Sequence, residues 1–199
     1  MTSALLTDRY ELTMIDAALK GGHAERQCVF EVFARRLSGG RRYGVVAGTG
    51  HLLDAVDNFR FDGPVLEWLR DEKIVSTTTL DFLADYRFNG SIRGYREGEL
   101  FFPGSPILQV EGTFAEAVVL ETLVLSILNY DCAVATAASR MVTAADGHDL
   151  IEMGSRRTSE HAAVAAARKS GGRVRMDKSI EEEEKRIEER KARELEEAA

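Results

Sequence analysis

Residues 114–130 read FAEAVVLETLVLSILNY, and residues 133–145 follow with AVATAASRMVTAA. Apolar side chains lie all around the first stretch, which predicts a helix buried on more than one face. The second stretch consists mostly of small residues and predicts a closely packed helix that Asp146-Gly147 ends. The longest apolar run, 117–128, is interrupted by Glu121 and is shorter than the roughly 20 residues of a membrane span. We therefore expect core helices and no membrane partner.

The chain continues with an α/β pattern after these helices. Residues 148–153 predict a buried strand, 154–157 a loop, and 158–168 another helix. One strand and one helix cannot bury both faces of a parallel sheet. The sequence therefore predicts an α/β domain that is begun and remains incomplete.

The chain before residue 113 alternates short helices and strands, which predicts an α+β domain. Asp8 and Glu11 form a capping-box pattern at the start of a helix over 8–20. Further helices are expected around residues 51–56, from Asp62-Gly-Pro64, and from Ser76 or Thr77 to Tyr86. Strands are expected at 28–34, 43–47, 92–95, 100–102 and 107–110, and the last three would form a small antiparallel sheet.

The end of the chain differs in composition from the rest. Residues 177–199 contain ten acidic and six basic side chains. Ser179 and Glu182 form a capping box, and pairs such as Glu181–Lys185 would support a solvated single helix. Ile180 and Ile187 are one heptad apart, so a weak coiled-coil or docking helix is the alternative. The expected division is 1–112, 113–170 and a charged helical tail at 171–199.

Charge and cysteine usage limit the classes of partner and compartment. The net charge is −7, and most of it comes from the tail. A nearly neutral body argues against nucleic acid as a partner, because phosphate binding needs a basic surface. Cys28 and Cys132 lie far apart in apolar runs, as buried thiols of a reducing compartment do. Asp8 and Arg9 break the only early apolar stretch, so we expect no secretory signal and a cytoplasmic protein.

The segment Glu152-Met-Gly-Ser-Arg-Arg157 is the strongest candidate binding site. It places Gly154, Ser155, Arg156 and Arg157 between the end of a strand and the start of a helix. Guanidinium groups and the N–H groups of a helix N-terminus both suit phosphate or carboxylate. The pattern predicts an anion site and does not specify a reaction.

Three other features have weaker functional signals. The arginines Arg35, Arg36, Arg41 and Arg42 could attract phosphates or form a solvated loop paired with surface carboxylates. The turn Gly48-Thr-Gly50 lacks the third glycine of a dinucleotide-binding loop, so a tight turn explains it better. The four histidines are not spaced as metal ligands, and we expect no metal site built by the protein alone.

Five blocks in order give the chain a family resemblance. They are Leu6-Thr-Asp-Arg-Tyr10-Glu-Leu-Thr-Met14, Phe33-Ala-Arg-Arg-Leu37 with Tyr43-Gly-Val-Val-Ala-Gly48, Gly94-Tyr-Arg-Glu-Gly98, Pro106-Ile-Leu-Gln-Val-Glu-Gly112 running on to Tyr130, and Glu152 to Arg157. Together, over about residues 4–168, they resemble the nicotinate phosphoribosyltransferases. The resemblance implies an α+β N-terminal domain joined to an α/β barrel, of which this chain would contain the first strand and helices.

The resemblance also implies an activity and its ligands. Such enzymes couple nicotinate to phosphoribosyl pyrophosphate in NAD biosynthesis, with ATP and Mg²⁺, and are commonly dimers with active sites at the subunit interface. Tyr10 would face the nicotinate ring, and Arg156 and Arg157, on the Gly154-Ser155 turn, would meet carboxylate or phosphate groups.

The resemblance ends near Arg168, before the histidine that the family phosphorylates, so no catalytic residue is assigned. We expect a truncated form of the enzyme. The alternatives are a non-catalytic binding or dimerisation module, associating through exposed apolar surface, or a related enzyme acting on nicotinamide or quinolinate. The opening Tyr10-Glu-Leu-Thr-Met14 block speaks against quinolinate.

Overall fold

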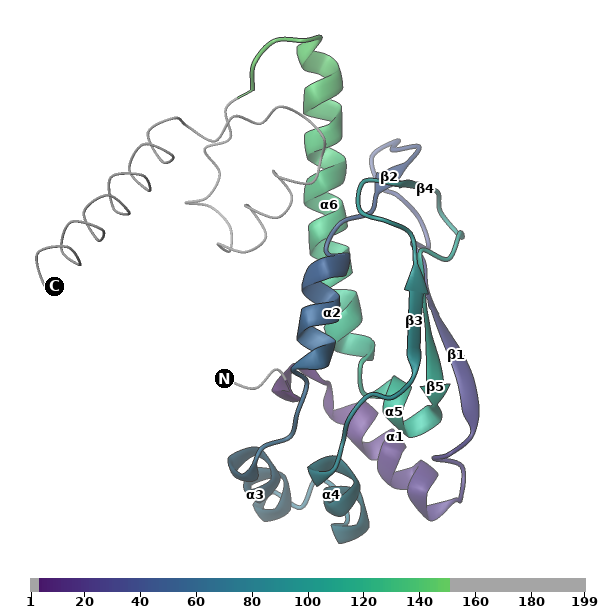
Figure 1. Cartoon of the computed structure of the whole chain (residues 1–199), viewed down its shortest axis with the longest axis vertical. Helices are drawn as coiled ribbons and strands as arrows, with labels where there is room; N and C mark the ends of the chain where they lie inside the picture. Colours follow the sequence, from purple (N-terminus) through teal and green to yellow (C-terminus); the bar gives the residue numbers. More distant parts are fainter. Residues whose placement is uncertain (1–3, 151–199) are drawn as a thin grey trace, which may run out of the picture.

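The computed structural model describes residues 4–150 of the 199-residue chain. In chain order the elements are η1 (Ala4–Leu6), α1 (Arg9–Lys20), β1 (Gln27–Val32), β2 (Gly44–Val45), α2 (Thr49–Asp57), α3 (Gly63–Asp71), α4 (Thr77–Ala84), β3 (Ser91–Gly94), β4 (Leu100–Phe101), β5 (Leu108–Thr113), α5 (Phe114–Val118) and α6 (Glu121–Ala145). Figure 1 shows α6 as a long helix along the molecule, with α2 beside it and the strands on the opposite side from α2.

The main sheet has β5 at its centre, between β1 and β3, and both neighbours are antiparallel to it. Burial alternates along β5: Leu108 and Val110 are buried, whereas Gln109 and Glu111 are only partly covered. This is the period of a sheet with one face on the core. Helices α1 and α5 pack on the inner side, where the Phe30 and Phe114 rings lie 6.2 Å apart.

A second, two-stranded sheet of β2 and β4 lies beside α6. Gly44 pairs with Phe101, and a Cβ at residue 44 would lie only 2.1 Å from the Phe101 ring. Glycine is therefore required where the backbone crosses this ring. The arrangement places the chain from β1 to β2 along one side of α6.

The structure confirms most of the expected elements and corrects two of them. Strand β4 pairs with β2 and does not join β3 and β5 in one sheet, because residues 96–99 turn the chain toward Val46. The expected helix over 114–130 is broken at 119–120, where Leu120 N–H bonds Ala117 O in a tight turn. Helix α6 then runs without interruption from Glu121 to Ala145. It ends where predicted, at Asp146, whose φ of 45° is left-handed.

Several expected features lie outside the described residues. They are residues 151–153 of the strand expected at 148–153, the helix at 158–168 and the charged tail at 171–199. The observed part is the mixed helix-and-strand portion of the expected fold. The boundary at residue 112 stays a prediction; in the described part, α5 and α6 share one hydrophobic core with α1 to α4.

Residues 114–145 are long and apolar enough, by length and composition, to cross a membrane. Half of the relevant window is buried inside the protein. The central helix of a soluble protein meets the same criterion, so this test alone is weak evidence for a membrane span.

Asp16 ties α1 to α4 and gives the fold a pH-dependent contact. Its Oδ1 accepts hydrogen bonds from Ser76 N at 2.9 Å and Thr79 Oγ1 at 2.7 Å. Burial alone would raise the pKa of Asp16, but hydrogen bonds from Lys20, Ser76 and Thr79 outweigh it and hold the pKa well below its usual value. A lowered folded-state pKa contributes stability above the unfolded pKa, and that stability is lost as the pH falls below about 4.

We expect Asp16→Asn to lower the free energy of unfolding at pH 7 by about 1.5–3 kcal/mol, because hydrogen bonds to a charged group are lost. Urea unfolding at several pH values measures this difference, which should shrink toward pH 3. The control is Asp81→Asn, which changes an exposed carboxylate on α4. Equal stability of the two variants at pH 7 would contradict the assignment.

Candidate functional site

Helix α6 and the segment that follows β1 face each other across a pocket of about 350 Å³. The segment contributes three arginines together with apolar side chains, and α6 contributes one mixed face. The lining includes Val32, Phe33, Arg35, Arg36 and Arg41 on one side, and Leu125, Asn129, Cys132 and Thr136 on the other.

The loop that carries the arginines is fixed at both ends. At its start, Ile107 N–H donates to Val32 O at 2.8 Å, and Gly104 N–H donates to Ala34 O at 2.9 Å. At its end, the Arg140 guanidinium of α6 donates to Tyr43 O at 3.2 Å and lies 5.2 Å from the centre of the Tyr43 ring. Such anchoring lets an exposed loop present side chains in a defined direction.

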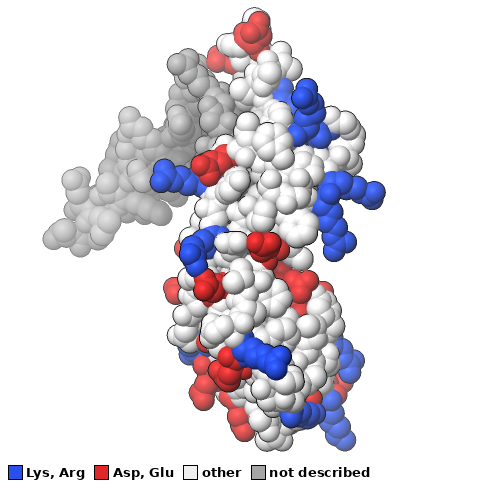
Figure 2. Space-filling view, turned by 90° about the vertical axis from the view of Figure 1, so that its right-hand side faces the viewer, with Lys and Arg blue, Asp and Glu red and all other residues white. Residues whose placement is uncertain are grey.

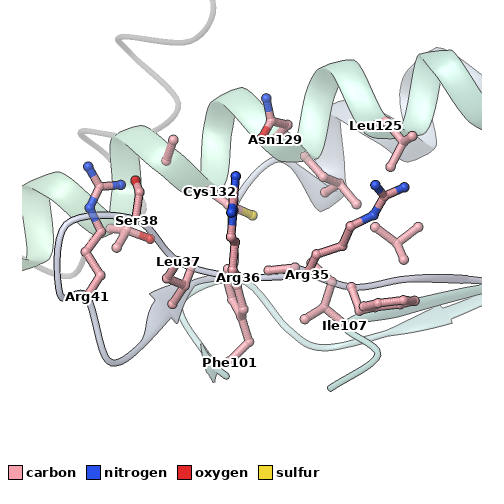
Figure 3. Close-up of a pocket in the computed structure, with 16 residues that line it drawn as sticks. Arg35, Arg36, Leu37, Ser38, Arg41, Phe101, Ile107, Leu125, Asn129 and Cys132 are labelled. Carbon is pink, nitrogen blue, oxygen red and sulfur yellow. The ribbon is translucent and has the colours of Figure 1, made fainter. Parts of the chain in front are cut away.

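The three arginines extend from this loop toward α6 (Figure 3). Across residues 4–150, no carboxylate forms an ion pair with Arg35, Arg36 or Arg41, although Arg93 does pair with Glu111. Basic side chains also stand out on the upper part of the surface in Figure 2. Unpaired guanidinium groups gathered at one pocket form a site for an anion. Within residues 4–150 the loop is therefore not paired with surface carboxylates, and it gathers three arginines at one pocket.

The wall opposite the arginines adds no negative charge. Burial raises the pKa of the Cys132 thiol to about 11, although its hydrogen bond with Ala47 acts in the other direction. The thiol is therefore neutral near pH 7 and is not a nucleophile. Asn129 is exposed on the same face and offers an amide to a ligand.

A second pocket, of about 330 Å³, adjoins the first. The two pockets share Val32, Phe33, Arg35 and Leu125. Its other walls are mainly apolar, including Phe30, Val110 and Val124, with Glu121 at the first turn of α6. We refer to the two adjoining pockets as the α6 groove: one end is basic, and the other is apolar with one carboxylate.

Tyr10 lies beside the Glu121 end of the α6 groove. It is in the first turn of α1 and is 46% exposed. Partial burial, followed by the hydrogen bond and the charge of Glu121, raises the pKa of Tyr10 to about 12. The phenol is neutral at physiological pH, and its ring remains accessible to a ligand. Tyr10 lines neither pocket and adjoins the groove through Glu121.

The other predicted site residues, Gly154, Ser155, Arg156 and Arg157, lie outside the described residues. The Gly48-Thr-Gly50 turn begins α2, with Gly48 at a φ of 94°. The Glu97 carboxylate already accepts hydrogen bonds there, from Thr49 Oγ1 at 2.6 Å and Gly50 N at 3.2 Å. A tight turn capped by a carboxylate is a poor phosphate site. Within 4–150 there is no cluster of three or more His, Cys, Asp or Glu side chains suited to a metal.

The α6 side of the groove was not predicted from the sequence as part of a site. Residues 125, 129, 132 and 136 recur at intervals of four, three and four, which is one face of a helix. That face mixes an exposed leucine, an amide, a thiol and a hydroxyl. This departure from a purely apolar stripe was the available signal.

Comparison with known proteins identifies the family. The family model described as the nicotinate phosphoribosyltransferase N-terminal domain matches residues 5–129, more than half of the chain. The chain belongs to the nicotinate phosphoribosyltransferase family. It is 63% identical over 166 residues to nicotinate phosphoribosyltransferase pncB1 of Mycobacterium tuberculosis, covering 83% of this chain and 37% of that protein. It is 35% identical over 157 residues to the Bacillus subtilis nicotinate phosphoribosyltransferase, covering 79% and 32%.

Solved structures show the same fold. Human nicotinic acid phosphoribosyltransferase matches with a TM-score of 0.74 and 30% identity, over 82% of this chain and 34% of that one. A nicotinate-nucleotide pyrophosphorylase from Pyrococcus furiosus matches with a TM-score of 0.60 at 21% identity, which shows a shared fold alone. The chain thus spans little more than a third of the length of these family members.

We expect Arg36→Ala to weaken the binding of inorganic pyrophosphate about tenfold, because one guanidinium–phosphate contact of roughly 1.4 kcal/mol is lost. Isothermal titration at two salt concentrations measures the affinity, and the wild-type affinity should fall at high salt. Arg93→Ala is the matched control, since Arg93 pairs with Glu111 away from the groove. The same loss of affinity in both variants would contradict a specific site.

Proposed function

We propose that this chain forms the N-terminal part of a nicotinate phosphoribosyltransferase, in which nicotinate and phosphoribosyl pyrophosphate give nicotinate mononucleotide and pyrophosphate, driven by ATP hydrolysis. The observation that carries the proposal is the α6 groove, which has three arginines at one end and, at the other, Glu121 in contact with Tyr10. The reaction joins an aromatic acid to a phosphorylated sugar, so it needs one surface for a ring and another for phosphates.

The basic end suits the phosphates of phosphoribosyl pyrophosphate or ATP. Arg35, Arg36 and Arg41 supply planar donor groups that match phosphate oxygens, and each keeps its charge at any physiological pH. Mg²⁺ commonly binds through substrate phosphates with few protein ligands.

The aromatic end suits nicotinate. Tyr10 offers an exposed ring face against which a pyridine ring can stack. By the family resemblance we assign Arg156 and Arg157, on the Gly154-Ser155 turn, to the carboxylate or phosphate groups of the same substrates. The proposed site therefore combines Tyr10 with residues that follow the described region.

We also propose a cytoplasmic homodimer. Phe33, Leu125 and Tyr130 are 47%, 44% and 41% exposed, and they supply an apolar surface near the groove that association would cover. Sedimentation of the purified chain should show a dimer or larger species at micromolar concentration. A monomer that persists at high concentration would contradict the proposed association.

We expect the chain to bind nicotinate, and Tyr10→Ala to weaken this binding about tenfold through loss of ring stacking. Tyr10→Phe keeps the ring and should stay within a few-fold of wild type. Isothermal titration with nicotinate, with and without phosphoribosyl pyrophosphate and Mg²⁺, measures both, and an assay for nicotinate mononucleotide with ATP tests turnover.

The control is Tyr95→Ala, another exposed tyrosine. Binding with turnover supports the full proposal. Binding alone supports the ligand assignment and leaves the chain as the non-catalytic module. No nicotinate binding by the wild-type chain would overturn the assignment of Tyr10.

A further inference from the structure

We propose that Glu11 is a positioning residue for the nicotinate site: its buried carboxylate fastens the first turn of α1 to the first turn of α6 and so sets the Tyr10 ring beside Glu121. The ligand rests on the proposed function, whereas the positioning itself rests on the contacts of Glu11. Glu11 does not line either pocket of the α6 groove.

Glu11 is a fully buried carboxylate whose two oxygens face opposite helices. Toward α1, Oε2 accepts hydrogen bonds from Asp8 N at 3.0 Å and from the Thr7 hydroxyl. Toward α6, Oε1 accepts from Thr122 N at 2.9 Å and Thr122 Oγ1 at 2.7 Å. A buried charge is retained only where such donors surround it. The side chain is therefore held in one place from both sides.

The bond to Thr122 N–H replaces a cap that α6 lacks. Leu120 occupies the N-cap position of α6 and has no side chain that can accept a hydrogen bond. The first N–H groups of a helix have no partner within it, and a negative charge there is favourable. Glu11, 111 residues earlier in the chain, supplies both the acceptor and the charge. The starting point of α6 is thereby fixed relative to α1.

Tyr10 lies next to Glu11 in the sequence and takes part in the same contact between the first turns of α1 and α6. Tyr10 and Glu11 are consecutive on α1, and their partners Glu121 and Thr122 are consecutive on α6. Tyr10 is exposed and Glu11 is fully buried, because successive residues point about 100° apart around a helix. The Glu11–Thr122 contact holds the two helix ends together and so sets the position of the Tyr10 backbone relative to Glu121.

The geometry explains why glutamate is needed at residue 11. Glutamine has the same length but turns one carboxylate oxygen into a donor. That NH₂ group would face Thr122 N–H or Asp8 N–H, which are donors themselves, and one of these contacts would be lost. Thr122→Val removes the hydroxyl and keeps the N–H, so it loosens the same connection from the other side.

The first test is spectroscopic and does not need a ligand. The full chain is labelled with ¹³C at the tyrosine ring carbon bearing the hydroxyl, and the Tyr10 signal is assigned by its loss in Tyr10→Phe. We expect Glu11→Gln and Thr122→Val to shift this signal, whereas Thr122→Ser leaves it unchanged. Glu116→Gln is the matched control, since Glu116 is also a third-position capping-box glutamate, on α5, but its carboxylate bonds Thr113 and Asn89 and, among residues 4–150, is not hydrogen-bonded to α6.

The second test is a double-mutant cycle on nicotinate affinity. Glu11→Gln should weaken nicotinate binding by about fivefold to tenfold in the wild-type chain and have little effect in the Tyr10→Ala background. A general loss of stability would lower binding equally in both backgrounds. That second pattern, or an unshifted Tyr10 signal in both Glu11→Gln and Thr122→Val, would overturn the proposal.

The two tests separate the proposal from the function on which it rests. If the wild-type chain does not bind nicotinate, the proposed ligand is wrong, and the Tyr10 signal still decides whether Glu11 positions the ring. If Glu11→Gln does not fold, Thr122→Val provides the same comparison, because it alters only one hydroxyl.

Discussion

The groove side of the molecule depends on the way the buried backbone of residues 45–47 is satisfied. Val45, Val46 and Ala47 are almost fully buried, and β4 alone cannot pair all of their polar groups. Val45 N–H donates to Thr136 Oγ1 at 2.8 Å and Ala47 N–H to Cys132 Sγ at 3.4 Å, whereas Val46 N–H turns to Glu99 O at 2.9 Å. The N–H groups of Val45 and Ala47, two residues apart, both point to α6, as alternate N–H groups of a strand point to the same neighbouring strand. Helix α6 therefore takes the place of a neighbouring strand and supplies the acceptors from its side chains.

This constraint decides where the arginine loop lies. Because residues 45–47 are fixed against α6, the chain between β1 and β2 must pass along the same helix. Its arginines then face a helix wall that has no acidic side chain at that end. Like charges gathered in this way repel one another and do not stabilise the fold by themselves. Three arginines gather at one pocket whose lining contains no carboxylate, whereas Lys20 and Arg93 pair with Asp16 and Glu111, so the cluster is best understood as a candidate ligand site.

The parts of the fold set by local chemistry could be predicted from the sequence. The capping box at Asp8, the proline-started α3 and the stop at Asp146 each depend on neighbouring residues, and all appear where expected. The pairing of β4 with β2 could not be predicted, because two-residue ladders have almost no sequence signal. Glu11 illustrates both the predictable and the unpredictable part of the fold. Its capping box is visible in the sequence, but its bond to Thr122 depends on the packing of two distant helices.

The same limit applies to the candidate site. The positive charge of the arginine loop could be recognised from the sequence, whereas the α6 wall opposite the loop could be identified only in the structure. The length of α6 between the two ends of the groove separates the roles of the arginines. Arg36 and Arg41 belong only to the pocket beside Cys132, which follows Glu121 by eleven residues, or about 16 Å of helix. Nicotinate is much shorter than this span, so under the proposed function a nicotinate stacked on Tyr10 would leave these two arginines to a phosphate-bearing ligand. Arg35 lines both pockets and is the groove arginine that both ligands can share.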